Sequence, residues 1–149
     1  MLPKTNEEMV KLLIKNGYLK SKKVIDAFKS VDRKYFVLPE YVNMAYEDTP
    51  LPLINDQTIS APHMVAIMTE LLELRGGERV MEIGSGSGYQ AAILSRIASF
   101  VYSIEIDTEL TELARANLKR AGIENVKVIA GDGKKGYEKA KPYDRVIVT

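Results

Sequence analysis

The sequence contains no cysteine and a single histidine, His63. Without cysteine the chain can form neither a disulfide framework nor a thiolate metal site. One histidine alone excludes most histidine-rich metal sites and weakens any interpretation as a Ser-His-Asp hydrolase. We therefore expect no metal in this protein.

Long apolar runs and a one-sided charge are missing as well. No run approaches the roughly 18 residues of a membrane-spanning helix, and no apolar secretory segment opens the chain. The 21 basic and 20 acidic residues are interspersed and leave a formal net charge of +1. Nucleic-acid binding usually needs a more one-sided basic surface. We expect a cytoplasmic protein that binds neither nucleic acid nor membrane.

The chain is long enough and apolar enough to form one domain with a buried core. Its 149 residues, 46% of them hydrophobic, are ordinary values for a globular protein. Its first half predicts a helix over 7–15, a second helix capped by Ser21 and a third that begins near Pro62. Between them, 32–60 is rich in proline and aromatic residues and indicates an irregular, partly extended segment. The third helix has an apolar stripe that we expect in the core: Met64, Val65, Met68, Leu71 and Leu72.

From Arg79 the pattern changes to apolar strands that alternate with helices. The strands are predicted over 79–83, 100–104, 126–130 and 145–149, and the helices over 89–98 and from a cap at Thr108 to Gly122. Strands that are apolar on both faces and joined by helices imply a parallel sheet covered on both sides. The fold class is therefore predicted to be α/β.

The sequence ends within the last predicted strand, at Ile147-Val148-Thr149. A terminal parallel strand with no helix after it leaves an open sheet edge. Either a partner covers this edge or a C-terminal portion is missing, and we favour the second. An open edge would also let the chain self-associate through its fourth strand.

A glycine-rich turn follows the first of these strands, in the run Val80-Met81-Glu82-Ile83-Gly84-Ser85-Gly86-Ser87-Gly88. Three glycines permit a tight turn and the close approach of a ligand to the backbone. The spacing differs from the dinucleotide pattern, because Tyr89 replaces its third glycine, and the lysine of the triphosphate loop is absent. Glu82 suggests a cationic ligand group nearby, such as the ammonium or sulfonium of S-adenosylmethionine. The alternative is a glycine turn without a ligand.

Acidic residues follow the next two strands. Glu105 can accept both hydrogen bonds from a ribose diol, or it simply flanks the following helix. Asp132, between Gly131 and Gly133, can meet an adenine amino group, or it marks an ordinary turn. With the glycine turn, and in this order, these residues resemble the class I methyltransferase fold. That fold usually has seven strands, so the fourth strand of this chain would be interior in a complete sheet.

The segment Gln57-Thr58-Ile59-Ser60-Ala61-Pro62-His63-Met64 makes the resemblance more specific, because it is similar to the T-I-S-x-P signature of protein-L-isoaspartate O-methyltransferases. Further similarities extend over essentially the whole chain, at Val31-Asp32-Arg33, Tyr35-Phe36-Val37, Ala45-Tyr46, Leu51-Pro52, Gly136-Tyr137 and Pro142-Tyr143-Asp144. The resemblance implies methyl transfer from S-adenosyl-L-methionine to the free carboxylate of L-isoaspartyl residues in damaged proteins, with D-aspartyl residues as a further candidate. S-adenosyl-L-homocysteine would be the second product.

The resemblance also implies roles for single residues. Ser60 matches the serine implicated in catalysis, although its spacing before Pro62 alone would make it a helix cap. The implied cofactor-binding residues are Thr58, Ile59, Glu82, Gly84, Ser85, Gly86, Ser87, Gly88, Glu105, Ile106, Asp132 and Gly133. Residues 1–62 would form a helical and irregular extension with the acceptor segment, and 63–149 the Rossmann-like cofactor-binding core without its C-terminal strands. We expect the full-length form to be a monomer.

Two other functions stay open. A class I methyltransferase with another acceptor would share the glycine turn but not the segment 57–64. A catalytically incomplete adenosyl-binding fragment would keep the turn and lack the peptide-binding part that the family's C-terminal third supplies.

Overall fold

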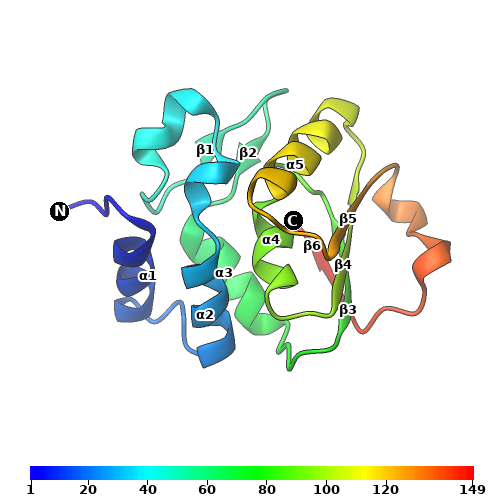
Figure 1. Ribbon diagram of the computed structural model, residues 1–149, viewed down its shortest axis with the longest axis horizontal. Helices are drawn as coiled ribbons and strands as arrows, with labels where there is room; N and C mark the ends of the chain where they lie inside the picture. The colour runs from blue at the N-terminus through cyan, green and yellow to red at the C-terminus, as the bar shows by residue number, and fades with distance from the viewer.

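A computed structural model describes residues 1–149 as a four-stranded sheet beside a layer of helices (Figure 1). The α-helices are α1 (Asn6–Lys15), α2 (Lys22–Ser30), α3 (Pro62–Leu71), α4 (Tyr89–Ser95) and α5 (Thr108–Arg120). The strands are β1 (Leu51–Pro52), β2 (Thr58–Ile59), β3 (Arg79–Ile83), β4 (Phe100–Glu105), β5 (Val126–Ala130) and β6 (Arg145–Val148). Short 3-10 helices are η1 (Arg33–Phe36), η2 (Pro39–Met44), η3 (Gly133–Lys135) and η4 (Glu138–Ala140).

The first helices begin close to where the sequence predicts them. Thr5 caps α1, because its hydroxyl accepts a hydrogen bond from the backbone amide of Glu8 at 3.2 Å. Ser21 precedes α2 as expected, but its hydroxyl makes no capping bond. Its backbone amide instead donates to the Glu70 carboxylate at 2.9 Å, which joins the start of α2 to α3. The segment 32–60 is irregular as predicted and contains η1, η2 and the antiparallel pair of β1 and β2.

The larger sheet has the strand order β5-β4-β3-β6, and all neighbouring strands are parallel. Helices α4 and α5 make the crossovers that join β3 to β4 and β4 to β5. The predicted bounds of β3 and β5 are correct, whereas α4 ends at Ser95 and not at Ala98. Thr108 is the first residue of α5 and not its cap, because the Asp107 carboxylate accepts hydrogen bonds from two amides of the first turn.

Only one face of the sheet is covered by α-helices. Figure 1 shows the helices on one side of the strands and the connection through η3 and η4 on the other. On this second face Tyr102 packs against Tyr137 and Tyr143, with ring centroids 6.0 and 5.8 Å apart. Val146 and Val148 of β6 are 50% and 65% exposed there. The α/β class is confirmed, but the expectation of a sheet covered on both faces is wrong for this chain.

One hydrophobic core joins the N-terminal helices to the sheet and extends from Met9 of α1 to Ile147 of β6. Helix α3 contributes Val65 and Ala66 to this core. The predicted stripe of α3 is wrong at Met64 and Leu71, which are 43% and 76% exposed. The buried face of the helix is instead formed by Pro62, Val65, Ala66 and Thr69. No helix combines the length and the apolar character that a membrane span requires.

Candidate functional site

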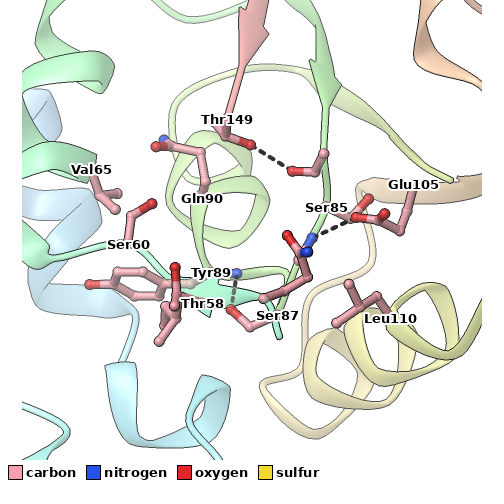
Figure 2. A pocket seen from close by; sticks show the side chains of 14 residues that line it. Thr58, Ser60, Val65, Ser85, Ser87, Tyr89, Gln90, Glu105, Leu110 and Thr149 are labelled. Carbon is pink, nitrogen blue, oxygen red and sulfur yellow. Dashed lines mark hydrogen bonds between the residues drawn. The ribbon is translucent and has the colours of Figure 1, made fainter. Parts of the chain in front are cut away.

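A cavity of about 260 Å³ lies at the carboxyl ends of β3, β4 and β6. Parallel α/β sheets bind their ligands at this end of the strands. Figure 2 shows the side chains around it, with Ser60 and Val65 on one side and Glu105 and Leu110 on the other. The lining residues are Gln57, Thr58, Ile59, Ser60, Val65, Gly84, Ser85, Gly86, Ser87, Tyr89, Gln90, Glu105, Leu110 and Thr149.

The glycine turn between β3 and α4 forms the floor of this cavity. Gly84 has φ +93°, and a Cβ atom there would lie 2.5 Å from the backbone oxygen of Thr149. Only glycine therefore lets the end of β3 and the end of β6 approach so closely. Gly88 has φ +88°, and a Cβ there would lie 3.3 Å from the backbone oxygen of Ala114, so a side chain would push the start of α4 away from α5.

Glu105, the last residue of β4, connects the glycine turn to the start of α5. Its Oε2 accepts a hydrogen bond from the backbone amide of Gly86 at 3.0 Å, and its Oε1 accepts one from the amide of Asp107 at 3.1 Å. Each carboxylate oxygen has a second lone-pair site. Because Glu105 also lines the cavity, these remaining sites can accept hydrogen bonds from ligand hydroxyls.

Glu82 lies beneath the turn and does not line the cavity. The hydroxyl of Ser103 donates to its Oε1, and Ser103 in turn shares a hydrogen bond with Ser85. The other carboxyl oxygen is buried without a partner. Burial raises the pKa of Glu82 to about 8, so the side chain is predominantly neutral at pH 7. In this arrangement Glu82 supports the turn through two serines and presents no negative charge to a cationic ligand group.

Ser60 follows β2 and is available to the cavity because it does not cap α3. The residue at the N-cap of α3 is Ala61, and no side chain makes a capping bond there. Thr58 and Ile59 of β2 line the cavity beside Ser60, and Ile59 is buried. The interpretation of Ser60 as a helix cap, which its spacing before Pro62 allowed, does not hold in this structure.

The hairpin that carries β1 and β2 is attached to the far side of the cavity through its tip. The Asn55 amide donates to the carboxylates of Asp107 and Glu109 at 2.8 and 3.0 Å. The backbone amide of Leu110 and this Asn55 contact hold the pKa of Asp107 below its ordinary value. The hairpin and the start of α5 are thus held together across the cavity.

The structure brings together eight of the residues singled out from the sequence and leaves five outside the cavity lining. The eight are Thr58, Ile59, Ser60, Gly84, Ser85, Gly86, Ser87 and Glu105, and the five are Glu82, Gly88, Ile106, Asp132 and Gly133. The side chain of Ile106 is 75% exposed. Asp132 accepts a hydrogen bond from the backbone amide of Lys134 at 3.0 Å, and Gly133 packs against Ile83. The assigned roles of these five residues at the cofactor stay predictions.

Sequence reasoning missed six of the lining residues, namely Gln57, Val65, Tyr89, Gln90, Leu110 and Thr149. The position of Thr149 at the cavity could have been predicted from the sequence. Parallel strands share a carboxyl edge, so the residue after β6 must lie beside the residue after β3, and the Thr149 hydroxyl indeed donates to the backbone oxygen of Gly84 at 2.6 Å. The positions of Val65 and Leu110 could not have been predicted, because an apolar stripe on a helix does not reveal which of its residues faces a cavity.

Known proteins resemble this chain over nearly its whole length. A family model described as protein-L-isoaspartate (D-aspartate) O-methyltransferase matches residues 4–149. The protein-L-isoaspartate O-methyltransferase of Ignicoccus hospitalis is 52% identical over 145 residues, which cover 95% of this chain and 69% of the relative. The protein of that name from Pyrococcus horikoshii is 50% identical over 141 residues, covering 94% and 64%. The chain spans between 60% and 69% of the length of such curated relatives.

Solved structures give the same picture. One protein-L-isoaspartate O-methyltransferase superposes with a TM-score of 0.87 at 35% identity, covering 97% of this chain and 47% of the other. A Plasmodium falciparum protein of the same description, in complex with S-adenosyl-L-homocysteine, gives a TM-score of 0.84 at 25% identity, covering 98% and 73%.

Proposed function

The chain belongs to the protein-L-isoaspartate (D-aspartate) O-methyltransferase family. From that premise we propose that it transfers a methyl group from S-adenosyl-L-methionine to the free carboxylate of L-isoaspartyl residues. The observation that carries the proposal is the meeting of the T-I-S segment with the glycine turn in one cavity. A cofactor held by the turn would there face an acceptor held beside Ser60. D-Aspartyl residues are a second acceptor within the same proposal.

The residues at the glycine turn fit an adenosyl cofactor. The turn approaches the cavity with backbone atoms alone at Gly84 and Gly86, so a ligand can lie close to the chain there. Glu105 is fixed by two backbone amides and keeps free lone-pair sites for a ribose diol. Thr58, Ile59 and Leu110 supply further wall. When bound, S-adenosyl-L-methionine supplies a methyl group on a positively charged sulfur.

The proposed reaction does not require strong acid or base catalysis by the protein. An isoaspartyl carboxylate, with a pKa near 4, is already ionised at neutral pH, so its oxygen can attack the methyl carbon without a general base. As the new carbon–oxygen bond forms, the sulfur–methyl bond breaks and its electron pair stays on sulfur. The chain's task is to hold oxygen, carbon and sulfur in line, where positioning supplies most of the advantage.

Ser60 suits the role of a hydrogen-bond donor to the acceptor carboxylate. A serine nucleophile would need an adjacent base, and the cavity lining contains neither histidine nor lysine. A donated hydrogen bond orients the carboxylate and leaves one oxygen lone pair for attack. In the division that we propose, residues 1–62 contain the acceptor-site segment, from which Thr58 and Ile59 also reach the cofactor, and residues 63–149 form the cofactor-binding core.

The test is transfer of labelled methyl from S-adenosyl-L-methionine to a peptide with one isoaspartyl residue. The same peptide with a normal aspartyl residue is the control, and the Pyrococcus horikoshii relative is the reference for assay conditions. The proposal expects base-labile label on the isoaspartyl peptide only, since methyl esters hydrolyse in base. Label on neither peptide, or equal label on both, would refute it for this chain.

Cofactor binding is measured separately, by calorimetry with S-adenosyl-L-homocysteine. Binding without transfer would favour the second candidate, an adenosyl-binding chain with an incomplete acceptor site. The shorter length of this chain relative to its curated relatives makes this candidate worth the separate measurement.

A further inference from the structure

Arg33 is a buried cation whose guanidinium contacts no carboxylate. It is the first residue of η1, its exposure is 0%, and its guanidinium donates only to backbone oxygens. Nη1 contacts the oxygens of Ala45 and Glu47 at 2.7 and 3.4 Å, and Nη2 those of Thr49 and Ser60 at 3.1 Å each. A buried charge is costly, and here four carbonyl dipoles offset that cost.

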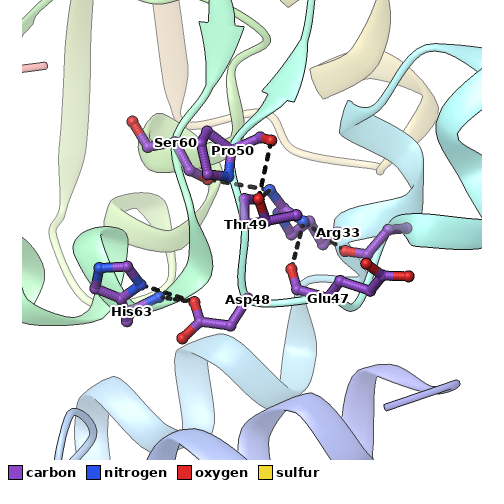
Figure 3. Close-up of polar contacts among 8 residues, drawn as sticks. Arg33, Glu47, Asp48, Thr49, Pro50, Ser60 and His63 are labelled. Carbon is purple, nitrogen blue, oxygen red and sulfur yellow. Dashed lines mark hydrogen bonds and ion pairs between the residues drawn. The ribbon is translucent and has the colours of Figure 1, made fainter. Parts of the chain in front are cut away.

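These contacts join two segments that are distant in the sequence (Figure 3). Three of the four oxygens belong to residues 45–49, and the fourth belongs to Ser60. The guanidinium is planar and presents its donors in a fixed fork, so it fixes the relative placement of both backbone segments. Its Nε has no partner, which concentrates all of its bonds on these two segments.

A second contact joins the same two segments on the other side of Ser60. Asp48 Oδ1 accepts a hydrogen bond from the backbone amide of His63 at 2.8 Å and also contacts the ring Nδ1 of His63 at 2.9 Å. The ring of His63 packs against Tyr18, with centroids 5.4 Å apart. Residues 60–63 are therefore held at both ends by residues 45–49, through Arg33 and through Asp48.

We propose that Arg33, with Asp48 as its support, is a positioning residue that fixes the Ser60 hydroxyl in the cavity by holding the Ser60 backbone. This inference rests on the proposed function, because it assigns a second residue to the action of Ser60. Ser60 has one rotatable bond between backbone and hydroxyl, so its backbone determines where the hydroxyl can lie. A misplacement of 1 Å at a reacting group can cost about 100-fold in rate.

The test is a double-mutant cycle of Arg33→Lys and Ser60→Ala. Lysine keeps the charge, but its single ammonium cannot reach four carbonyls. In the wild-type background we expect Arg33→Lys to lower kcat for methyl transfer by about 10-fold to 100-fold, with the peptide KM and the Kd for S-adenosyl-L-homocysteine within about twofold. In the Ser60→Ala background the same substitution should change kcat by less than about twofold. Equal losses in both backgrounds would overturn the proposal.

Arg115→Lys is the matched control. Arg115 also donates two hydrogen bonds to a backbone oxygen, that of Val128, but it lies outside the cavity lining. This variant should leave kcat unchanged. If Arg33→Lys does not fold, Asp48→Ala replaces it in the cycle, because Asp48 is partly exposed and makes no direct contact with the Arg33 guanidinium. The same non-additive pattern is expected from it, and an additive loss would count against the proposal.

Amide hydrogen exchange tests the positioning role of Arg33 independently of the proposed methyl transfer. Arg33→Lys should raise the exchange rate of the amides of His63 and Val65, which donate hydrogen bonds to Asp48 and Ala61 in the held segment, by about 10-fold or more, whereas Arg115→Lys should not. Unchanged exchange at these amides would overturn the positioning role even for an active enzyme. A wild-type chain without methyl transfer would refute the proposed function, and the exchange measurement would still decide whether Arg33 holds this segment.

Discussion

The backbone amide of Gly86 donates to the carboxylate of Glu105 over 3.0 Å, so the residue that ends β4 also holds the turn that follows β3. The sequence suggested a ribose-binding carboxylate at this position and gave no sign of the second task. Both tasks draw on the same two oxygens. The cavity therefore depends on Glu105 for its shape, in addition to the hydrogen bonds that we propose from Glu105 to a ribose.

Glu105→Gln should weaken binding of S-adenosyl-L-homocysteine by about 10-fold or more, because one of the two amides held by the carboxylate loses its acceptor and the charge is lost. Calorimetry measures the change. Glu112→Gln is the control, since Glu112 is an exposed residue of α5 that pairs only with Arg115. An unchanged affinity in Glu105→Gln would remove Glu105 from the cofactor site.

Ser60→Ala separates acceptor chemistry from cofactor binding. A hydrogen bond to a charged group contributes about 1.5–3 kcal/mol, so its loss should lower kcat/KM for the isoaspartyl peptide by about 10-fold to 100-fold. The affinity for S-adenosyl-L-homocysteine should stay within about twofold. Ser30→Ala is the control, because the Ser30 hydroxyl bonds to the backbone of Ala27 within α2. Equal losses of rate and affinity would refute the donor role.

The elements of the sheet could be predicted from the sequence because their signals are local. The bounds of β3 and β5 follow from short apolar runs that end at glycine or polar residues, and the structure confirms them. Which faces of the sheet are covered by helices could not be predicted in the same way. Val146 and Val148 have the pattern of buried residues but are 50% and 65% exposed, and the α-helices of this chain lie on the other face of the sheet (Figure 1). An apolar pattern shows what a strand can bury and does not show which segment covers it.

The cavity was predicted to the extent that its residues belong to motifs at strand ends. Glu105 and the glycine turn are of this kind, and so is Ser60 through its signature segment. Arg33 is different, because its four partners are backbone oxygens up to 27 residues away in the sequence. Backbone oxygens carry no residue-specific signal, so a charged residue that binds them looks like any surface arginine until the chain is folded.

Gly133 was singled out as a cofactor residue, yet its packing gives it a structural task that can be measured. A Cβ atom at Gly133 would lie 2.4 Å from Cγ2 of Ile83, whereas one at Gly131 would meet nothing within 4 Å. Gly133→Ala should therefore lower the free energy of unfolding by about 1–3 kcal/mol through overpacking. Gly131→Ala, the matched control, should change it by less than about 0.5 kcal/mol. Urea unfolding of both variants checks this, and equal values would show that Ile83 moves aside without cost.

The buried carboxyl of Glu82 should make the stability of the chain depend on pH. Burial raises its pKa in the folded state to about 8, against an ordinary value of 4.5, and the nearby carboxylate of Glu105 adds to the rise. Between these two values the folded chain binds more protons than the unfolded chain. The stabilising contribution of Glu82 is therefore complete below about pH 4.5 and is lost as the pH rises through about 8.

Glu82→Gln removes the titrating group and keeps an acceptor for the Ser103 hydroxyl, so this part of the pH dependence should disappear. Relative to the variant, the wild-type chain should lose free energy of unfolding steadily from about pH 5 to about pH 8 and then level off. Urea midpoints at several pH values measure the difference between the two curves. Glu112→Gln, which removes an exposed carboxylate, should give a curve parallel to that of the wild type. If the Glu82→Gln curve is parallel as well, Glu82 titrates in the folded chain as it does in the unfolded one, and its support of the glycine turn does not depend on a bound proton.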